Sequence, residues 1–170
     1  MLLYHGSNTN IKSISLAMCR PYKDFGRGFY LTELNEQAIK MAKRVAKIYG
    51  GEPIVNTYEI KDDFLNDTEL NIRKFDDQPA EDWARFVMNN RSRIFTDYSR
   101  KECNLDNKYD IVVGPVANDD MAMLFRQYQN EIITFDNLIS GMTFRKTTNQ
   151  YSFHTERAIA LLRKVGVQHD

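Results

Sequence analysis

Cysteine, net charge and long apolar runs are all scarce in this chain of 170 residues. Its two cysteines, Cys19 and Cys103, have neither CxxC spacing nor further partners, which argues against a zinc site and a disulfide framework. Lys and Arg together number 23, as do Asp and Glu, so no net field draws the chain to nucleic acid or an anionic membrane. No stretch approaches the roughly 18 apolar residues of a membrane span, and the apolar start is too short for a signal sequence. We therefore expect a cytoplasmic protein without a metal ion.

Internal repeats, low-complexity linkers and a GxGxxG phosphate loop are also absent from the sequence. The missing phosphate loop disfavours a hydride-transfer enzyme of the dinucleotide-binding type. The length suits one domain that buries roughly 70% of its unfolded surface. Because helix-like and strand-like segments alternate between short turns, we expect a single α+β domain over residues 1–170.

Hydrophobic periodicity and turn residues place the elements of this domain. Strands are expected at 2–7, 28–33, 53–60, 109–115 and 150–154, and helices at 34–49, 78–90, 117–128 and from Thr155 onward. We expect the first two strands to be central in the sheet. Trp83 has core spacing in its helix, Asn118 or Asp119 is expected to cap the third helix, and Thr155 to cap the last.

Two glycines flank Arg27 immediately before the second expected strand. Glycine costs backbone entropy, so it is useful only where φ must be positive or where another group comes close. Gly26 and Gly28 therefore predict a close approach to the backbone at this point.

Four motifs appear in order along the chain. They are YHGS at Tyr4–Ser7, DFGRGFYLT at Asp24–Thr32, GPVAND at Gly114–Asp119 and QYSFHT at Gln150–Thr155. Their order and spacing resemble the ADP-ribosyltransferase superfamily, in the branch that includes diphtheria toxin and the poly(ADP-ribose) polymerases. More closely, the chain resembles a bacterial family of small stand-alone ADP-ribosyltransferase-like proteins over nearly all of its length. The resemblance implies a split β-sheet with surrounding helices, and NAD+ as substrate.

The resemblance also implies roles for single residues. His5 would hydrogen-bond a ribose hydroxyl, since imidazole both donates and accepts; alternatively, it is a structural histidine at a turn. Gly6 would present its N–H and C=O to the nicotinamide carboxamide, with Ser7 beside it. Tyr30 would stack on the nicotinamide ring, which is worth about 0.5–1.5 kcal/mol beyond area burial, or pack as a strand tyrosine. Met41 stands where polymerase-type relatives carry a second aromatic residue.

The glycine-rich segment would lie against the same dinucleotide. Gly26 and Gly28 would leave room for NAD+ at the floor of the cleft. Asp24 and Arg27 are candidates to grip the diphosphate side, because a guanidinium fork suits phosphate oxygens. The alternative is that both charges belong to an exposed loop.

The third catalytic position of the superfamily is normally a glutamate, and here it is Gln150. A carboxylate stabilises the positive charge that develops on the ribose, whereas an amide mainly orients a hydroxyl. Three interpretations are open: Gln150 suffices for a single transfer, Glu156 or Glu131 supplies the carboxylate, or catalysis is lost.

The function predicted from the resemblance is mono-ADP-ribosyl transfer from NAD+ to a macromolecular acceptor, with release of nicotinamide. Protein is favoured over nucleic acid as acceptor because the chain is neutral overall, and the acceptor surface is expected within residues 62–108. The resemblance suggests a toxin neutralised by a small antitoxin protein. The alternatives are an inactive NAD+-binding module and an NAD+ glycohydrolase.

Overall fold

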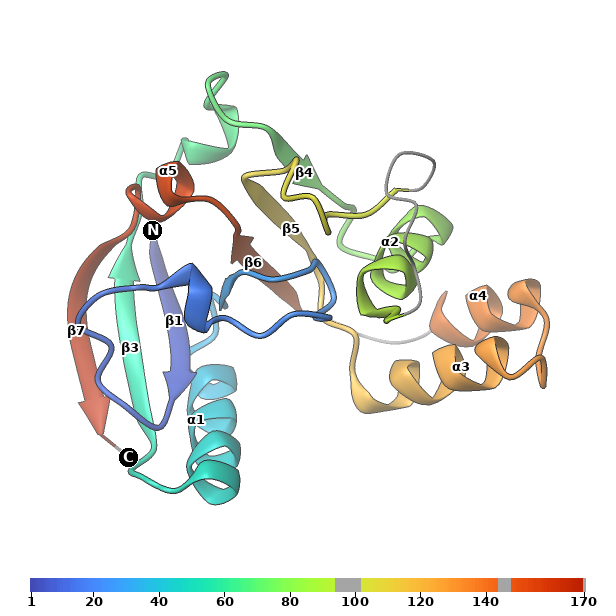
Figure 1. Ribbon diagram of the computed structural model, residues 1–170, viewed down its shortest axis with the longest axis horizontal. Coiled ribbons are helices and arrows are strands. Elements are labelled where there is room, and N and C mark those ends of the chain that lie inside the picture. Colours follow the sequence, from blue (N-terminus) through green and yellow to red (C-terminus); the bar gives the residue numbers. More distant parts are fainter. Residues whose placement is uncertain (94–101, 144–147, 170) are drawn as a thin grey trace.

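The computed structural model describes residues 1–93, 102–143 and 148–169. Within these ranges the fold is mixed α+β, with two β-sheets and five α-helices (Figure 1). The expected α+β class is confirmed. Residues 94–101, which form part of the expected acceptor surface, lie outside the described residues.

The first sheet has three antiparallel strands in the order β1-β3-β7. Its strands are β1 (Leu2–Ser7), β3 (Ile54–Glu59) and β7 (Arg163–His169). Helix α1 (Asn35–Tyr49) packs on β1 and β3 through the buried residues Ala38 and Ala42, which form a small apolar cluster with Val55.

The second sheet has four strands in the order β2-β6-β5-β4. Its strands are β2 (Phe29–Leu31), β6 (Asn149–Phe153), β5 (Ile111–Pro115) and β4 (Ile72–Lys74), and only the β4–β5 pair is parallel. The other helices are α2 (Glu81–Arg91), α3 (Asp119–Gln129), α4 (Phe135–Thr143) and the one-turn α5 (Glu156–Ile159). Two 3₁₀ turns lie at Leu16–Met18 and Phe64–Asn66.

The two sheets meet at a single backbone bridge between β1 and the end of β2. Tyr4 N–H donates to Thr32 O at 2.8 Å, and Thr32 N–H donates to Tyr4 O at 3.0 Å. β1 and β2 are each at the edge of their own sheet, so the prediction that they are central strands is wrong. The two edges instead face each other across the split between the sheets.

Strand alternation assigns the two faces of β2 to different cores. Phe29 and Leu31 enter the core between the two sheets, together with Leu3 and Phe153. Tyr30 points the other way, toward the core that the second sheet forms with α2, α3 and α4. Trp83 is fully buried in that second core, as its spacing predicts.

The expected elements are largely confirmed, with three omissions. Strand β4, helix α4 and strand β7 were not predicted. The Thr155 hydroxyl caps α5 by accepting from Ala158 N–H at 3.4 Å, but the helix ends after four residues. The chain then continues as β7 at the edge of the first sheet, where Val165 and Val167 are partly exposed and give a weak strand pattern. Among the described helices, none has the length and apolar character needed to span a bilayer.

Candidate functional site

His5 and Tyr30 are in direct contact at the split between the sheets. The Tyr30 carbonyl can only accept, so His5 Nδ1–H donates to it, at 2.7 Å. The His5 ring stacks on Phe29 with centroids 4.4 Å apart. Burial lowers the pKa of His5 despite this hydrogen bond. His5 is therefore a neutral imidazole whose Nε2 accepts, and no described residue occupies Nε2.

Gly6 lies on β1, two residues past the bridged Tyr4. Along a strand, the backbone N–H and C=O groups of successive residues point to opposite edges. Those of Gly6 therefore point to the same edge as those of Tyr4. A Cβ at Gly6 would lie 2.1 Å from Ala38 O and 2.6 Å from Ala42 N, so glycine is required for β1 to approach α1. Met41 lies on this helix beside Gly6 and is half exposed, at 50%.

Ser7 follows at the end of β1 and is buried. Its hydroxyl accepts from Thr9 N–H at 3.3 Å, which closes the turn after the strand. Its predicted part in binding NAD+ stays a prediction.

The Tyr30 hydroxyl both donates and accepts a hydrogen bond. The hydroxyl donates to Gly26 O at 2.7 Å and accepts from Phe25 N–H at 2.9 Å. Burial and the nearby Asp24 carboxylate raise the pKa of Tyr30, so the phenol is neutral. The glycine-rich loop is thereby tied directly to the tyrosine beside His5.

Gln150 lies near the start of β6, at the same split. Leu31 pairs with Tyr151, so one step further in this register Gln150 lies across from Thr32, whose backbone is bridged to β1. Its Nε2 donates to Asp24 Oδ2 at 2.8 Å and to Pro115 O at 3.3 Å. The backbones of His5, Tyr30 and Gln150, from three distant parts of the sequence, thus lie near one junction. The described side-chain partners of Gln150 are Asp24 and Pro115, and its side chain has no described contact with His5 or Tyr30.

Asp24 is a buried partner of this site, at 7% exposure. Arg91 Nε donates to its Oδ1 at 2.8 Å, Arg91 Nη2 lies 2.7 Å from the same oxygen in an ion pair, and Ala117 N–H donates to Oδ2 at 3.1 Å. Neither predicted role fits this geometry: the carboxylate is saturated by protein donors, so it is neither a free ligand for a diphosphate nor an exposed loop charge.

The close approach predicted at the glycines is real, but protein groups make it. A Cβ at Gly28 would lie 2.6 Å from His154 Nδ1, and Gly26 has a φ of 91° with Asn104 O 3.0 Å from its missing Cβ. Protein groups therefore account for both glycines, and the floor that they would leave for NAD+ stays a prediction. Arg27 is exposed, and its Nη1 donates to Ala17 O at 3.3 Å.

Ser152 and His154 form a pair that resembles a nucleophile and its base, but both are buried. His154 Nδ1–H donates to Arg27 O at 2.7 Å, and its Nε2 accepts from the Ser152 hydroxyl at 2.8 Å. Burial, only partly opposed by the bond to Arg27 O, lowers the pKa of His154 to about 4. The pair therefore holds β6 against the glycine-rich loop and carries no reaction.

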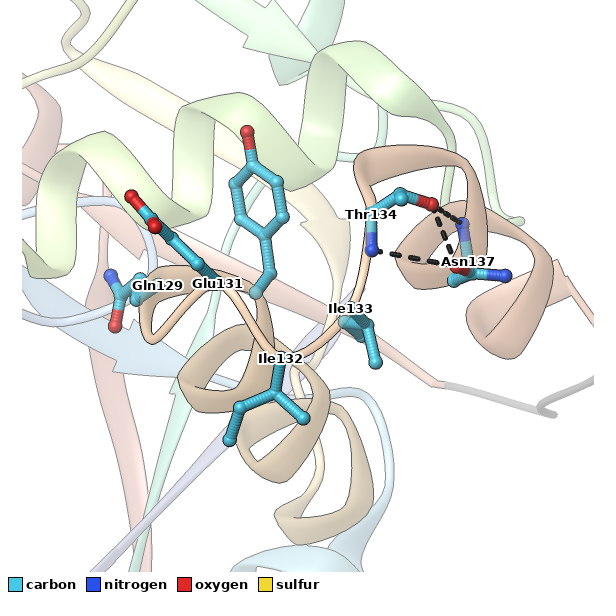
Figure 2. A pocket seen from close by; sticks show the side chains of 7 residues that line it. Gln129, Glu131, Ile132, Ile133, Thr134 and Asn137 are labelled. Carbon is cyan, nitrogen blue, oxygen red and sulfur yellow. Dashed lines mark hydrogen bonds between the residues drawn. The ribbon is translucent and has the colours of Figure 1, made fainter.

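The two alternative carboxylates both lie away from Gln150. Glu156 begins α5, beyond the opposite end of β6. Glu131 lies on the turn between α3 and α4, where it lines a pocket of about 460 Å³ (Figure 2). In that pocket the Thr134 hydroxyl accepts from Asn137 N–H at 3.2 Å, which caps α4, and it donates to Asn137 Oδ1 at 2.7 Å. We assign no chemistry to this pocket.

The sequence of the chain matches the model of one protein family. The model of a family described as "Protein of unknown function (DUF3990)" matches residues 1–163. The chain belongs to the DUF3990 family. No curated protein and no solved structure matches this DUF3990 chain. The family description names no activity, so the function of the DUF3990 protein is argued from its site.

Sequence reasoning missed the chemistry of GPVAND and of Arg91 in this DUF3990 protein. The Pro115 carbonyl accepts from Gln150 and from Trp83 Nε1, the latter at 3.1 Å, and the Ala117 amide meets Asp24. The signal was present, since DFG, GPVAND and the glutamine stand out as motifs. Within the described residues, no three His, Cys, Asp or Glu side chains gather as a metal site.

Proposed function

We propose that this DUF3990 protein is a mono-ADP-ribosyltransferase that uses NAD+ as substrate. The observation that supports it is the convergence of His5, Tyr30 and Gln150 at the Tyr4–Thr32 bridge. This junction has the groups that a nicotinamide nucleoside requires. They are hydrogen-bond acceptors for ribose hydroxyls, an edge N–H and C=O for a carboxamide, and an aromatic ring.

His5 Nε2 and Gln150 Oε1 supply the two acceptors. Among the described residues that are not exposed, the only buried side-chain polar atoms without a partner are Asn35 Oδ1, Tyr58 OH and Arg73 Nε. Neither acceptor of the site is in that set and neither has a described donor, so both are open to solvent. Each is therefore a candidate acceptor for a ribose hydroxyl.

The reaction breaks the bond between the ribose C1 and the nicotinamide nitrogen, and the electron pair leaves with nicotinamide. Positive charge develops at C1, where the acceptor nucleophile forms the new bond and then loses a proton. Gln150 orients a ribose hydroxyl but adds no charge, and the nearby Asp24 carboxylate is balanced by Arg91. Losing one electrostatic element of this kind typically costs about 3 kcal/mol, or roughly two powers of ten in rate. A slow, single transfer fits these groups better than polymer synthesis.

The test is to incubate the protein with adenylate-labelled NAD+ and bacterial lysate, and to follow both nicotinamide release and label on macromolecules. We expect labelled acceptor with the native chain and its loss in His5→Ala, Tyr30→Ala and Gln150→Ala. His169→Ala is the matched control, because His169 is exposed at the end of β7. Absence of nicotinamide release from the native chain would overturn the transferase proposal.

The same experiment separates the remaining alternatives. Nicotinamide and free ADP-ribose without labelled macromolecule would indicate a glycohydrolase. NAD+ that raises the melting temperature without any turnover would indicate a binding module.

A further inference from the structure

Gln150 replaces the glutamate implied by the resemblance, and a buried carboxylate lies one hydrogen bond behind it. We propose that Asp24 is a positioning residue, which holds the Gln150 amide in a single orientation with Oε1 turned outward as an acceptor. The role of that acceptor toward a ribose hydroxyl rests on the proposed function. The orientation of the amide does not, because it follows from protein contacts alone.

The Asp24 carboxylate receives three hydrogen bonds and one further ion-pair contact from Arg91, which together engage both of its oxygens. Oδ1 accepts one from Arg91 Nε and lies 2.7 Å from Arg91 Nη2, and Oδ2 accepts one from Ala117 N–H and one from Gln150 Nε2. These contacts come from three residues that lie far apart in the sequence, Arg91, Ala117 and Gln150. The carboxylate is therefore fixed in place before any substrate arrives.

The orientation of the amide follows from the chemistry of its neighbours. The Asp24 carboxylate and the Pro115 carbonyl can only accept, at 2.8 and 3.3 Å from the same nitrogen. Turning the amide by half a rotation would place Oε1 against both acceptors and leave its N–H groups outward. That orientation is repulsive, so Gln150 offers an acceptor and never a donor to the outside.

This lock gives a neutral amide the hydrogen-bonding direction of a carboxylate. A free glutamine side chain would present donors or an acceptor in turn, and only the acceptor can hold a hydroxyl proton. Preorganisation of such groups contributes strongly to rate, since a small misplacement costs about 100-fold. Asp24 thus acts through Gln150 and not by touching the substrate.

The first test needs no turnover. In the ¹⁵N-labelled full chain, the side-chain amide protons of Gln150 should exchange with solvent far more slowly than those of the exposed Gln78. Asp24→Asn should shift the Gln150 amide resonances and speed their exchange. Asp110→Asn is the matched control, because Asp110 is also a buried carboxylate paired with an arginine. Exchange at Gln150 as fast as at Gln78 in the wild-type chain would overturn the proposal, even where Asp24→Asn does not fold.

The second test concerns the substrate. Asp24→Asn should lower kcat for nicotinamide release about 100-fold, with little change in KM for NAD+. Asp110→Asn should leave kcat of the folded protein unchanged. Equal kcat in both variants would show that Asp24 serves stability alone. If the wild-type chain has no turnover, the proposed function fails while the exchange measurement still decides the orientation of Gln150.

Discussion

Asp24 and Asp110 are two buried carboxylates built in the same way and placed in different parts of the fold. Each is bound by two nitrogens of one arginine, by one backbone N–H and by one further side chain. For Asp110 these partners are Arg157, Asn71 N–H at 2.8 Å and the Thr155 hydroxyl at 2.6 Å. They join the end of β6 and the cap of α5 to the start of β4.

The difference lies in what the partners leave open. The Thr155 hydroxyl donates to Asp110 and accepts from Ala158 N–H, so both of its roles are used inside the protein. Gln150 Nε2 donates to Asp24 and Pro115, which leaves Oε1 facing outward. The same arrangement of bonds therefore ties chain segments together in one region and aims an atom at a candidate substrate in the other.

The largest expected difference between the two regions concerns their arginines. Arg91→Ala leaves the Asp24 carboxylate buried without a counter-ion and should lower the free energy of unfolding by about 3 kcal/mol. Arg157→Ala should cost clearly less, because the Arg157 side chain is 60% exposed and that of Arg91 only 30%. Urea denaturation of both variants measures this. Equal losses would mean that the two sites are energetically equivalent.

Gln150→Glu removes the amide donor to Asp24 at the candidate site. The new carboxyl would face Asp24 Oδ2 and Pro115 O, so its folded pKa should rise above the unfolded value. Stability is then present at low pH and lost as pH rises through the folded pKa, at a cost of about 2 kcal/mol near pH 8. Melting curves at about pH 5 and pH 8 test this sign.

The exchanged pair Asp24→Asn/Gln150→Glu supplies the control for that prediction. It moves the carboxylate from position 24 to position 150 and restores one amide donor between the two positions. The double variant should therefore be more stable at high pH than the sum of the two single losses allows. Strict additivity would argue against direct coupling of the two side chains.

A smaller effect on stability is expected at the Asp110 arrangement. Thr155→Ala removes both the cap of α5 and one donor to Asp110, and should cost about 1 kcal/mol. Thr155→Ser retains a hydroxyl and should recover most of the loss in thermal unfolding. Nicotinamide release should be the same in all three proteins. A change in kcat would place Asp110 in the working site after all.

The smallest effect is the acid response of Asp110. Burial opposes its ionisation, but the hydrogen bonds from Arg157, Thr155 and Asn71 outweigh burial and lower the pKa of Asp110. Its contribution to stability is thus present above the unfolded pKa and is lost as pH falls through the folded pKa. Below about pH 4, the melting temperature of Asp110→Asn should therefore fall less with decreasing pH than that of the wild type. Melting temperatures of wild type and Asp110→Asn that fall in parallel with decreasing pH would contradict this.

The sequence predicted local features better than contacts across the chain. Strand β1, helix α1 and the Thr155 cap follow from periodicity and residue type, which act over a few residues. The bond between Asp24 and Gln150 spans 126 residues, and no local pattern encodes it. Gly28 illustrates both sides: its residue type predicted a close approach, whereas only the fold shows that His154 is the group that approaches.

The arrangement of the first sheet also bears on the order in which a nascent chain matures. Strand β3 pairs on one side with β1 and on the other with β7, and the candidate site needs β6 beside β2. A ribosome-bound chain therefore holds His5 and Tyr30 without their partner until residue 150 has left the exit tunnel. One flank of β3 stays unpaired until residues 163–169 follow. The junction where the proposed chemistry would occur is therefore completed only after β6 has emerged to pair with β2.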